Sequence, residues 1–143
     1  KAFEELRELG WIDSPQPKFV SIQAEGCQPL VRAFKEGHTT AQPHENASTL
    51  ASGLRVPTVF ADYIILDIIR QTGGTALSVS DREMLDAMNE LASAEGIFAA
   101  PEGAATLVGL KKLLKQDFFQ GHETIVLINT GSGLKYLDVL DPL

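Results

Sequence analysis

The chain has 143 residues, of which 44% are hydrophobic, and carries a formal net charge of −7. This length predicts one domain or part of one, with a sizeable core. The acidic balance disfavours nucleic acid as a partner, because nucleic-acid binding requires a basic face. No apolar run reaches the roughly 18 residues of a membrane span, so we expect no membrane association and a cytoplasmic location.

The cysteine and histidine content argues against two further classes of protein. Cys27 is the only cysteine, and the three histidines have no spacing that places two of them on one helix turn. A disulfide framework and a cysteine-based zinc cluster are therefore excluded. We expect no metal site.

The first half of the chain predicts a helix, a strand and a second helix before a long polar segment. Apolar residues at helical spacing predict a helix over residues 2–9, and the apolar run after Pro17 predicts a strand over residues 18–23. A glycine-containing turn then leads into a short helix over residues 28–35. Residues 38–52 have neither period. Loops of this length are often functional, and both a mobile cover and an ordinary surface loop remain open.

A third helix, a second strand and a fourth helix follow. The helix that opens at Thr58 and ends at Gly73 is apolar almost all round, which predicts that it is well buried. Residues 75–80 predict a strand. The S-x-x-E pattern from Ser80 to Glu83 predicts a capping box, in which the two residues satisfy free amides at the start of the fourth helix.

The last third of the chain predicts a short extended segment (IFAA), a helix and a third strand. Pro101 suits the first turn of a helix that extends to Phe118, and the apolar run over residues 124–128 predicts a strand. This alternation is typical of a three-layer α/β/α fold with a mostly parallel sheet. Three strands leave the faces of five helices poorly covered. We therefore expect residues 1–143 to be a single or partial α/β domain from the C-terminal portion of a longer enzyme.

The turn over residues 129–133 is the most informative of the strand ends. Ligands in open α/β sheets bind beyond the carboxyl ends of strands. Gly131 and Gly133 permit close approach of the backbone, and the hydroxyls of Thr130 and Ser132 offer hydrogen bonds. A plain strand exit and the wall of a ligand site both fit this pattern.

No complete catalytic set can be assembled from the residues. The sequence has no recognisable Ser/His/Asp arrangement and no glycine-rich phosphate motif. Glu95 and Glu102 flank the segment GIFAAP, but the first ends a predicted helix and the second begins the next, where an acid favours the helix dipole. We therefore assign no catalytic residue.

Four stretches in order resemble the C-terminal part of the threonine synthase family, which belongs to the fold-type II pyridoxal-phosphate enzymes. They are SIQAEGCQPLVRAF, TLASGLRVP, GGTALSVSDREML and the segment from EGIFAAPEGAATLVGL to IVLINTGSGLKY. Serine and threonine dehydratases share the last segment in looser form. The resemblance covers nearly the whole chain and implies part of the large domain of such an enzyme.

The resemblance implies that the full-length protein uses pyridoxal phosphate to convert O-phospho-L-homoserine and water to L-threonine and phosphate. It places Thr130 beside the pyridine nitrogen of the cofactor and Gly53 close to the ring, with Ser52 and Gly131 as further contacts. The Schiff-base lysine and the phosphate loop of the family lie upstream of the matched stretch. We therefore expect this chain alone to be inactive, and the full-length protein to be a homodimer.

Two alternatives remain beside this interpretation. One is another fold-type II enzyme, such as a threonine dehydratase or a serine racemase. The other is a non-catalytic α/β binding module derived from such an enzyme.

Overall fold

The computed structural model describes residues 1–139. Its elements are α1 (Ala2–Glu8), β1 (Val20–Ala24), α2 (Pro29–Lys35), the 3-10 helix η1 (Ser52–Leu54), α3 (Asp62–Gln71), β2 (Thr75–Val79), α4 (Asp81–Glu95), α5 (Pro101–Leu114) and the 3-10 helix η2 (Gly133–Val139). None of the helices among these residues has the length and hydropathy of a membrane span.

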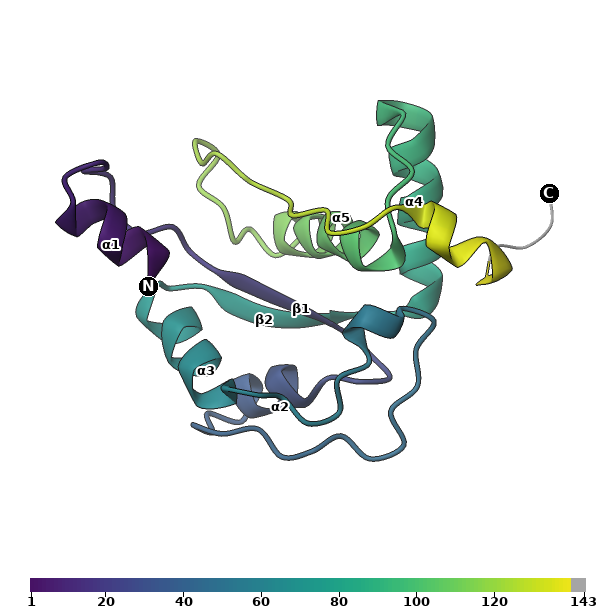
Figure 1. Cartoon of the computed structure of the whole chain (residues 1–143), viewed down its shortest axis with the longest axis horizontal. Coiled ribbons are helices and arrows are strands. Elements are labelled where there is room, and N and C mark those ends of the chain that lie inside the picture. Colours follow the sequence, from purple (N-terminus) through teal and green to yellow (C-terminus); the bar gives the residue numbers. More distant parts are fainter. Residues whose placement is uncertain (140–143) are drawn as a thin grey trace.

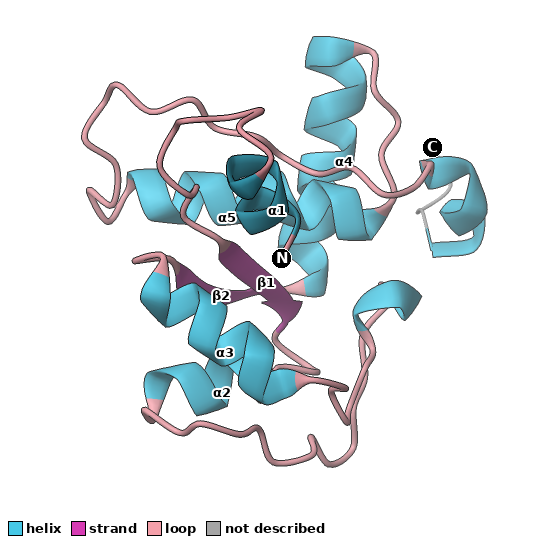
Figure 2. Cartoon of the chain, turned by 60° about the vertical axis from the view of Figure 1, so that its left-hand side comes forward, coloured by secondary structure: helices cyan, strands magenta, loops and turns pink. Residues whose placement is uncertain are grey.

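The sheet separates two layers of helices. β1 and β2 pair in parallel, with Val20 opposite Thr75 and Ala24 opposite Val79. Helices α2 and α3 pack against one face, and α5 packs against the other with α4 beside it (Figure 1). Figure 2 shows the same layers after a rotation. The predicted three-layer α/β/α fold with a parallel sheet is confirmed.

Buried side chains on both faces hold the layers together. The core between the sheet and helices α4 and α5 includes Val79, Met84, Met88, Ala104 and Val108. On the opposite face, Leu30, Leu66, Val31, Ile69 and Ala76 form two further buried clusters. Burying these side chains removes apolar surface from water, which is the main favourable contribution to folding.

The predicted capping box is present and is extended by a lysine from α5. The Ser80 hydroxyl accepts a hydrogen bond from the Glu83 amide at 3.2 Å, and the Glu83 carboxylate accepts one from the Ser80 amide at 2.8 Å. The Lys112 ammonium donates to the same carboxylate at 2.8 Å and to the Ser78 carbonyl at 3.0 Å. Glu83 therefore links β2, α4 and α5.

The stability that Glu83 confers depends on pH. Burial raises the pKa of Glu83, but hydrogen bonds from Lys112 and Ser80 and the charge of Lys112 outweigh this and hold the pKa below its ordinary value of 4.5. Because the folded-state pKa is lowered, the stabilisation is fully present above pH 4.5 and is lost as the pH falls through the folded-state pKa.

We expect Glu83→Gln to lower the free energy of unfolding at neutral pH by about 1 kcal/mol, because the amide keeps an acceptor but loses the charge. Thermal unfolding of the full-length protein should show that the difference from wild type shrinks between about pH 7 and about pH 3.5. Glu90→Gln, which disrupts an exposed pair with Lys111, is the control and should cost less than about 0.5 kcal/mol. Equal differences at both pH values would contradict this assignment.

The predicted third strand is wrong for the part of the chain that the structure describes. Residues 124–128 run as an extended segment without a strand partner, and Val126 and Ile128 are 77% and 69% exposed. A strand needs a neighbour for its backbone amides and carbonyls, and none of residues 1–139 supplies one here. The sequence pattern indicates β propensity, which does not specify a partner.

Two helix predictions also need correction. The third helix begins at Asp62 and not at Thr58, because Ala61 has a left-handed backbone with φ of 59° at the N-cap. This helix is not well buried, since Tyr63 and Ile64 are 59% and 45% exposed. The last long helix ends at Leu114, so Phe118 lies beyond it.

Candidate functional site

The candidate site lies around the first turn of α5. The arrowheads of β1 and β2 point toward this end of the molecule, and both η1 and the C-terminal segment approach it (Figure 1). It is therefore at the carboxyl ends of the parallel strands, where open α/β sheets bind ligands. Three segments that are remote in the sequence meet here: residues 49–54, residues 98–103 and residues 129–136.

The glycine-containing turn is fixed to the segment that precedes α5. The Ala100 amide donates to the Gly131 carbonyl at 2.9 Å, and the Gly133 amide donates to the Phe98 carbonyl at 2.9 Å. Between them, Ala99 and Ser132 form an isolated antiparallel bridge. This agrees with the predicted extended character of the IFAA segment.

A side chain at position 133 would prevent this contact. A Cβ atom there would lie 2.7 Å from the ring of Phe98. Glycine is therefore required by close packing at this position, and the same requirement keeps the turn against the start of α5.

Thr130 is exposed to solvent in this turn. The side-chain hydrogen bonds of the turn come from Asn129 and Ser132, which accept from the Gly131 and Leu134 amides at 3.5 Å and 3.3 Å. The Thr130 hydroxyl takes part in none of the side-chain hydrogen bonds among residues 1–139, so it is available to a ligand.

Asn129 reaches the helix that underlies the turn. A Cβ atom added to Gly103 would lie 2.1 Å from the Asn129 side-chain oxygen. Alanine otherwise favours a helix over glycine by about 1 kcal/mol. The space between Gly103 and Asn129 therefore decides the sign of a substitution at position 103.

We expect Gly103→Ala to destabilise the full-length protein by about 1 kcal/mol, because Asn129 must rotate out of the way. In an Asn129→Ala background, the same substitution should be neutral or stabilising by up to about 1 kcal/mol. Thermal unfolding of the four proteins in a double-mutant cycle measures this coupling. Additive effects would show that the two residues are not in contact.

Ser52 and Gly53 lie in η1 and are tied to the same helix. The Gly53 amide donates to the Glu102 carboxylate at 2.8 Å. The Ser52 hydroxyl lies 2.7 Å from the hydroxyl of Tyr136, which donates to the same Glu102 oxygen at 2.5 Å. All four predicted cofactor contacts, at positions 52, 53, 130 and 131, thus belong to segments anchored at the start of α5.

Glu102 and Tyr136 were not predicted as site residues. The sequence places Glu102 in the first turn of a helix, and the structure confirms this position. Its hydrogen bond to Gly53 spans 49 residues of sequence, which no local pattern reveals. Tyr136 follows the predicted turn closely, and that proximity was the one available signal.

The long polar segment over residues 38–52 is held at several points. The Ala41 amide donates to the Asp62 carboxylate at 2.5 Å, and the Ser48 amide donates to the Gly26 carbonyl at 3.0 Å. The Asp81 carboxylate accepts from the Thr49 hydroxyl at 2.5 Å and from the Leu50 amide at 3.0 Å. The end of the segment that leads to η1 is therefore fixed to the first turn of α4.

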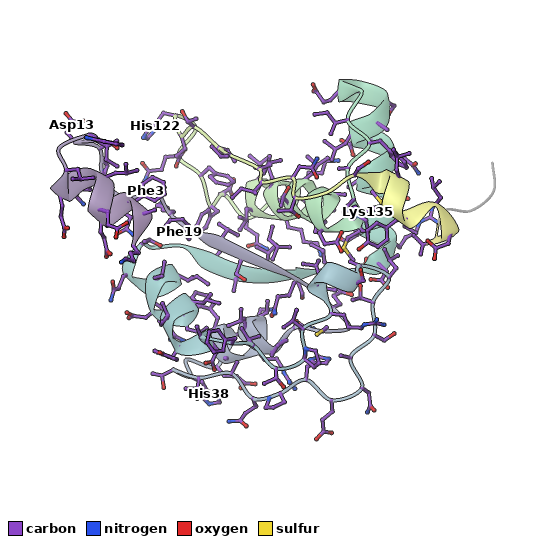
Figure 3. The ribbon with its side chains drawn as sticks, viewed as in Figure 1. Phe3, Asp13, Phe19, His38, His122 and Lys135 are labelled. Atoms are coloured by element: carbon purple, nitrogen blue, oxygen red, sulfur yellow. The ribbon has the colours of Figure 1, made fainter. Side chains whose placement is uncertain are left out.

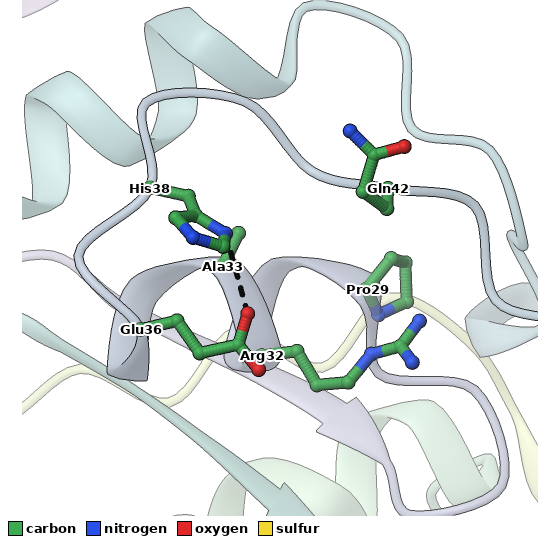
Figure 4. A pocket seen from close by; sticks show the side chains of 6 residues that line it. All are labelled: Pro29, Arg32, Ala33, Glu36, His38 and Gln42. Carbon is green, nitrogen blue, oxygen red and sulfur yellow. Dashed lines mark ion pairs between the residues drawn. The ribbon is translucent and has the colours of Figure 1, made fainter.

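The surface hollows of the described residues lie elsewhere. One, of about 180 Å³, is lined by Pro29, Arg32, Ala33, Glu36, His38 and Gln42 (Figure 4). His38 is paired with Glu36 at 3.2 Å and lies on the opposite side of the sheet from Lys135 of η2 (Figure 3). This volume is below the 300 Å³ or so of small-molecule sites. The candidate site is thus one wall of a site and not an enclosed pocket.

An α/β fold with a ligand wall at the carboxyl ends of its strands is that of a cofactor- or substrate-binding enzyme domain. The chain belongs to the family described as pyridoxal-phosphate dependent enzymes, whose model matches residues 2–131.

Individual relatives are threonine synthases. Over 135 residues, which are 94% of this chain, it is 43% identical to the threonine synthase of Methanosarcina acetivorans. Over the same length it is 40% identical to that of Methanocaldococcus jannaschii. The matched region is 33% of each relative, so the chain spans about a third of their length. These similarities confirm the family resemblance seen in the sequence.

Solved structures support the fold. An L-serine ammonia-lyase from Rhizomucor miehei matches 96% of this chain and 44% of its own, with a TM-score of 0.61 and 18% identity. A bacterial threonine deaminase matches 78% of this chain and 38% of its own, with a TM-score of 0.60 and 20% identity. At these identities the likeness concerns the fold alone.

The residues present fit one side of a pyridoxal-phosphate site. Thr130 offers an exposed hydroxyl without a partner among the described residues, which suits a polar ring atom. At Gly53, a Cβ atom would lie 2.8 Å from the Glu102 carboxylate, so only glycine leaves this approach open. No lysine joins the network of Ser52, Gly53, Glu102 and Tyr136 in residues 1–139.

Proposed function

We propose that this chain is the C-terminal portion of a threonine synthase, which converts O-phospho-L-homoserine and water to L-threonine and phosphate with pyridoxal phosphate. The observation that carries the proposal is the identity of 43% and 40% to two threonine synthases over 94% of the chain. The arrangement of the candidate site supports it, because the residues at positions 52, 53, 130 and 131 gather at one helix start.

Each of these residues has a role in the proposal. The Thr130 hydroxyl hydrogen-bonds the pyridine nitrogen, and Gly53 lets the backbone approach the ring. Ser52 and Gly131 make further contacts at the two sides. When bound, pyridoxal phosphate withdraws electrons from the substrate carbon. A hydroxyl at position 130 hydrogen-bonds a neutral ring nitrogen, whereas a carboxylate would stabilise its protonated form.

The chain itself contributes binding and orientation. The turn over residues 129–133 is fixed by the Ala100 and Gly133 amides, which holds the Thr130 hydroxyl in one place. Preorganised contacts of this kind reduce the entropic cost of binding. The lysine and the phosphate loop of the family are expected in the remainder of the protein, and this chain alone is expected to be inactive.

The test uses the full-length protein, with pyridoxal phosphate and O-phospho-L-homoserine, and follows phosphate and threonine together. Equal release of both products is the expected result. Ammonia from serine or threonine, without phosphate release, would overturn the proposal in favour of a dehydratase. Failure to bind the cofactor would overturn it in favour of a non-catalytic module.

Three finer expectations belong to the same proposal. We infer that the full-length enzyme is a homodimer in the cytoplasm, and that residues 1–143 are part of its large domain. Sedimentation of the full-length protein measures the first of these. A monomer at micromolar concentration would contradict it.

A further inference from the structure

One carboxylate oxygen joins the two segments that carry the predicted cofactor contacts. Glu102 Oε1 accepts from the Gly53 amide at 2.8 Å and from the Tyr136 hydroxyl at 2.5 Å. Tyr136 is also 2.7 Å from the Ser52 hydroxyl. Hydrogen bonds to an ionised acceptor are roughly twice as strong as neutral ones. Glu102 thus holds η1 and η2 against the first turn of α5.

The segment that leads to Gly53 is anchored at its other end by a second carboxylate. Asp81 accepts from Thr49 and Leu50 at the start of α4. Between the two anchors, Ala51 is fully buried. The Thr49 end is itself buried, at 8% exposure, whereas the Glu102–Gly53 bond is exposed to solvent. Glu102 therefore controls the end that solvent can loosen.

Glycine at position 53 and the acid at position 102 are matched. A Cβ atom at Gly53 would lie 2.8 Å from Glu102 Oε1 and 3.1 Å from its Cγ. The absence of a side chain at position 53 therefore permits the approach of Glu102 from within the chain. A general attraction between an acid and the helix dipole would not require this contact with another segment.

We propose that Glu102 is a positioning residue, which with Tyr136 fixes Ser52 and Gly53 in the conformation that binds the cofactor. This inference rests on the proposed function, since it concerns the same pyridoxal-phosphate site. Glu102 acts as a hydrogen-bond acceptor and transfers no proton. A neutral side chain with the same acceptor should therefore replace it.

The experiment measures the dissociation constant of pyridoxal phosphate for the full-length apoenzyme. Glu102→Ala should weaken binding about tenfold, because η1 is no longer held before the cofactor arrives. Glu102→Gln should restore affinity to within about twofold, since its amide oxygen accepts both hydrogen bonds. Tyr136→Phe should weaken binding about threefold, because one of the two donors is lost. Glu95→Ala, at the exposed end of α4, is the control and should have no effect.

A second readout separates positioning from a general loss of fold. In the apoenzyme, amide hydrogen exchange over residues 50–56 should be faster in Glu102→Ala and Tyr136→Phe, with exchange over residues 75–79 unchanged. Faster exchange in both regions would overturn a local positioning role, as would wild-type affinity in Glu102→Ala.

The remaining outcomes are also decisive. Equal damage in Glu102→Gln and Glu102→Ala would show that charge or proton transfer matters and would overturn the acceptor role. If the wild-type apoenzyme does not bind pyridoxal phosphate, the proposed function fails together with this inference. If it binds and the Glu102 variants bind equally well, only this inference fails.

Discussion

Gly26→Ala should destabilise the full-length protein by roughly 3 kcal/mol, among the largest effects of any single methyl group in this chain. A Cβ atom at this position would lie 1.8 Å from the Ser48 carbonyl oxygen. That oxygen belongs to the backbone and cannot rotate away, so the segment must move as a whole. The hydrogen bond from the Ser48 amide to the Gly26 carbonyl at 3.0 Å would be lost with it.

The consequence of this displacement should reach the candidate site. Ser48 precedes Thr49, whose hydroxyl donates to Asp81 at 2.5 Å, and Thr49 leads directly into η1. Thermal unfolding measures the loss of stability, and a cofactor titration measures the weaker binding that we expect with it. Gly37→Ala is a matched control. Its φ is +74° with no atom within 4 Å of a Cβ, so it should cost only the 1–2 kcal/mol or so of left-handed strain. Equal effects of the two substitutions would show that the contact with Ser48 does not constrain the segment.

Thr130→Val should lower kcat/KM of the full-length enzyme roughly tenfold to a hundredfold. Valine keeps the branched shape and removes the hydroxyl. A hydrogen bond to an ionisable partner is worth about 1.5–3 kcal/mol, which converts to this range. The absorbance of the bound cofactor should change as well, because the proposed partner of the hydroxyl is the pyridine nitrogen. Initial rates and the absorbance spectrum measure the two effects.

The neighbouring hydroxyl provides the control for this substitution. Ser132 accepts from the Leu134 amide at 3.3 Å within its own turn. Ser132→Ala should therefore leave the spectrum unchanged and lower the rate by no more than about threefold. A Thr130→Val enzyme with the rate and spectrum of wild type would remove Thr130 from the proposed site.

Local patterns predicted the elements whose signals lie within a few residues. The Ser80–Glu83 capping box is present with both of its hydrogen bonds, because its geometry depends on one helix turn only. The strand over residues 75–79 and the helix that begins at Pro101 follow from the same kind of local signal. The layered parallel fold then follows from the alternation of elements.

The predictions that failed depend on partners outside the local segment. Residues 124–128 have the composition of a strand, but a strand forms only beside another strand, and none of residues 1–139 lies in that place. Ile64 has helical spacing and remains 45% exposed, since periodicity does not state what covers a face. The bonds of Glu102 to Gly53 and Tyr136 cross 49 and 34 residues and become visible only in the folded chain.

The most direct test of the shared cofactor wall is hydrogen exchange of the full-length protein with and without pyridoxal phosphate. If η1 and the turn after residue 128 form one wall of the cofactor site, the cofactor should slow exchange in two separate segments, residues 49–56 and residues 128–134. Residues 29–42, on the other side of the sheet, should exchange at the same rate in both states. Protection of only one segment, or of neither, would contradict the convergence of these residues on a common cofactor.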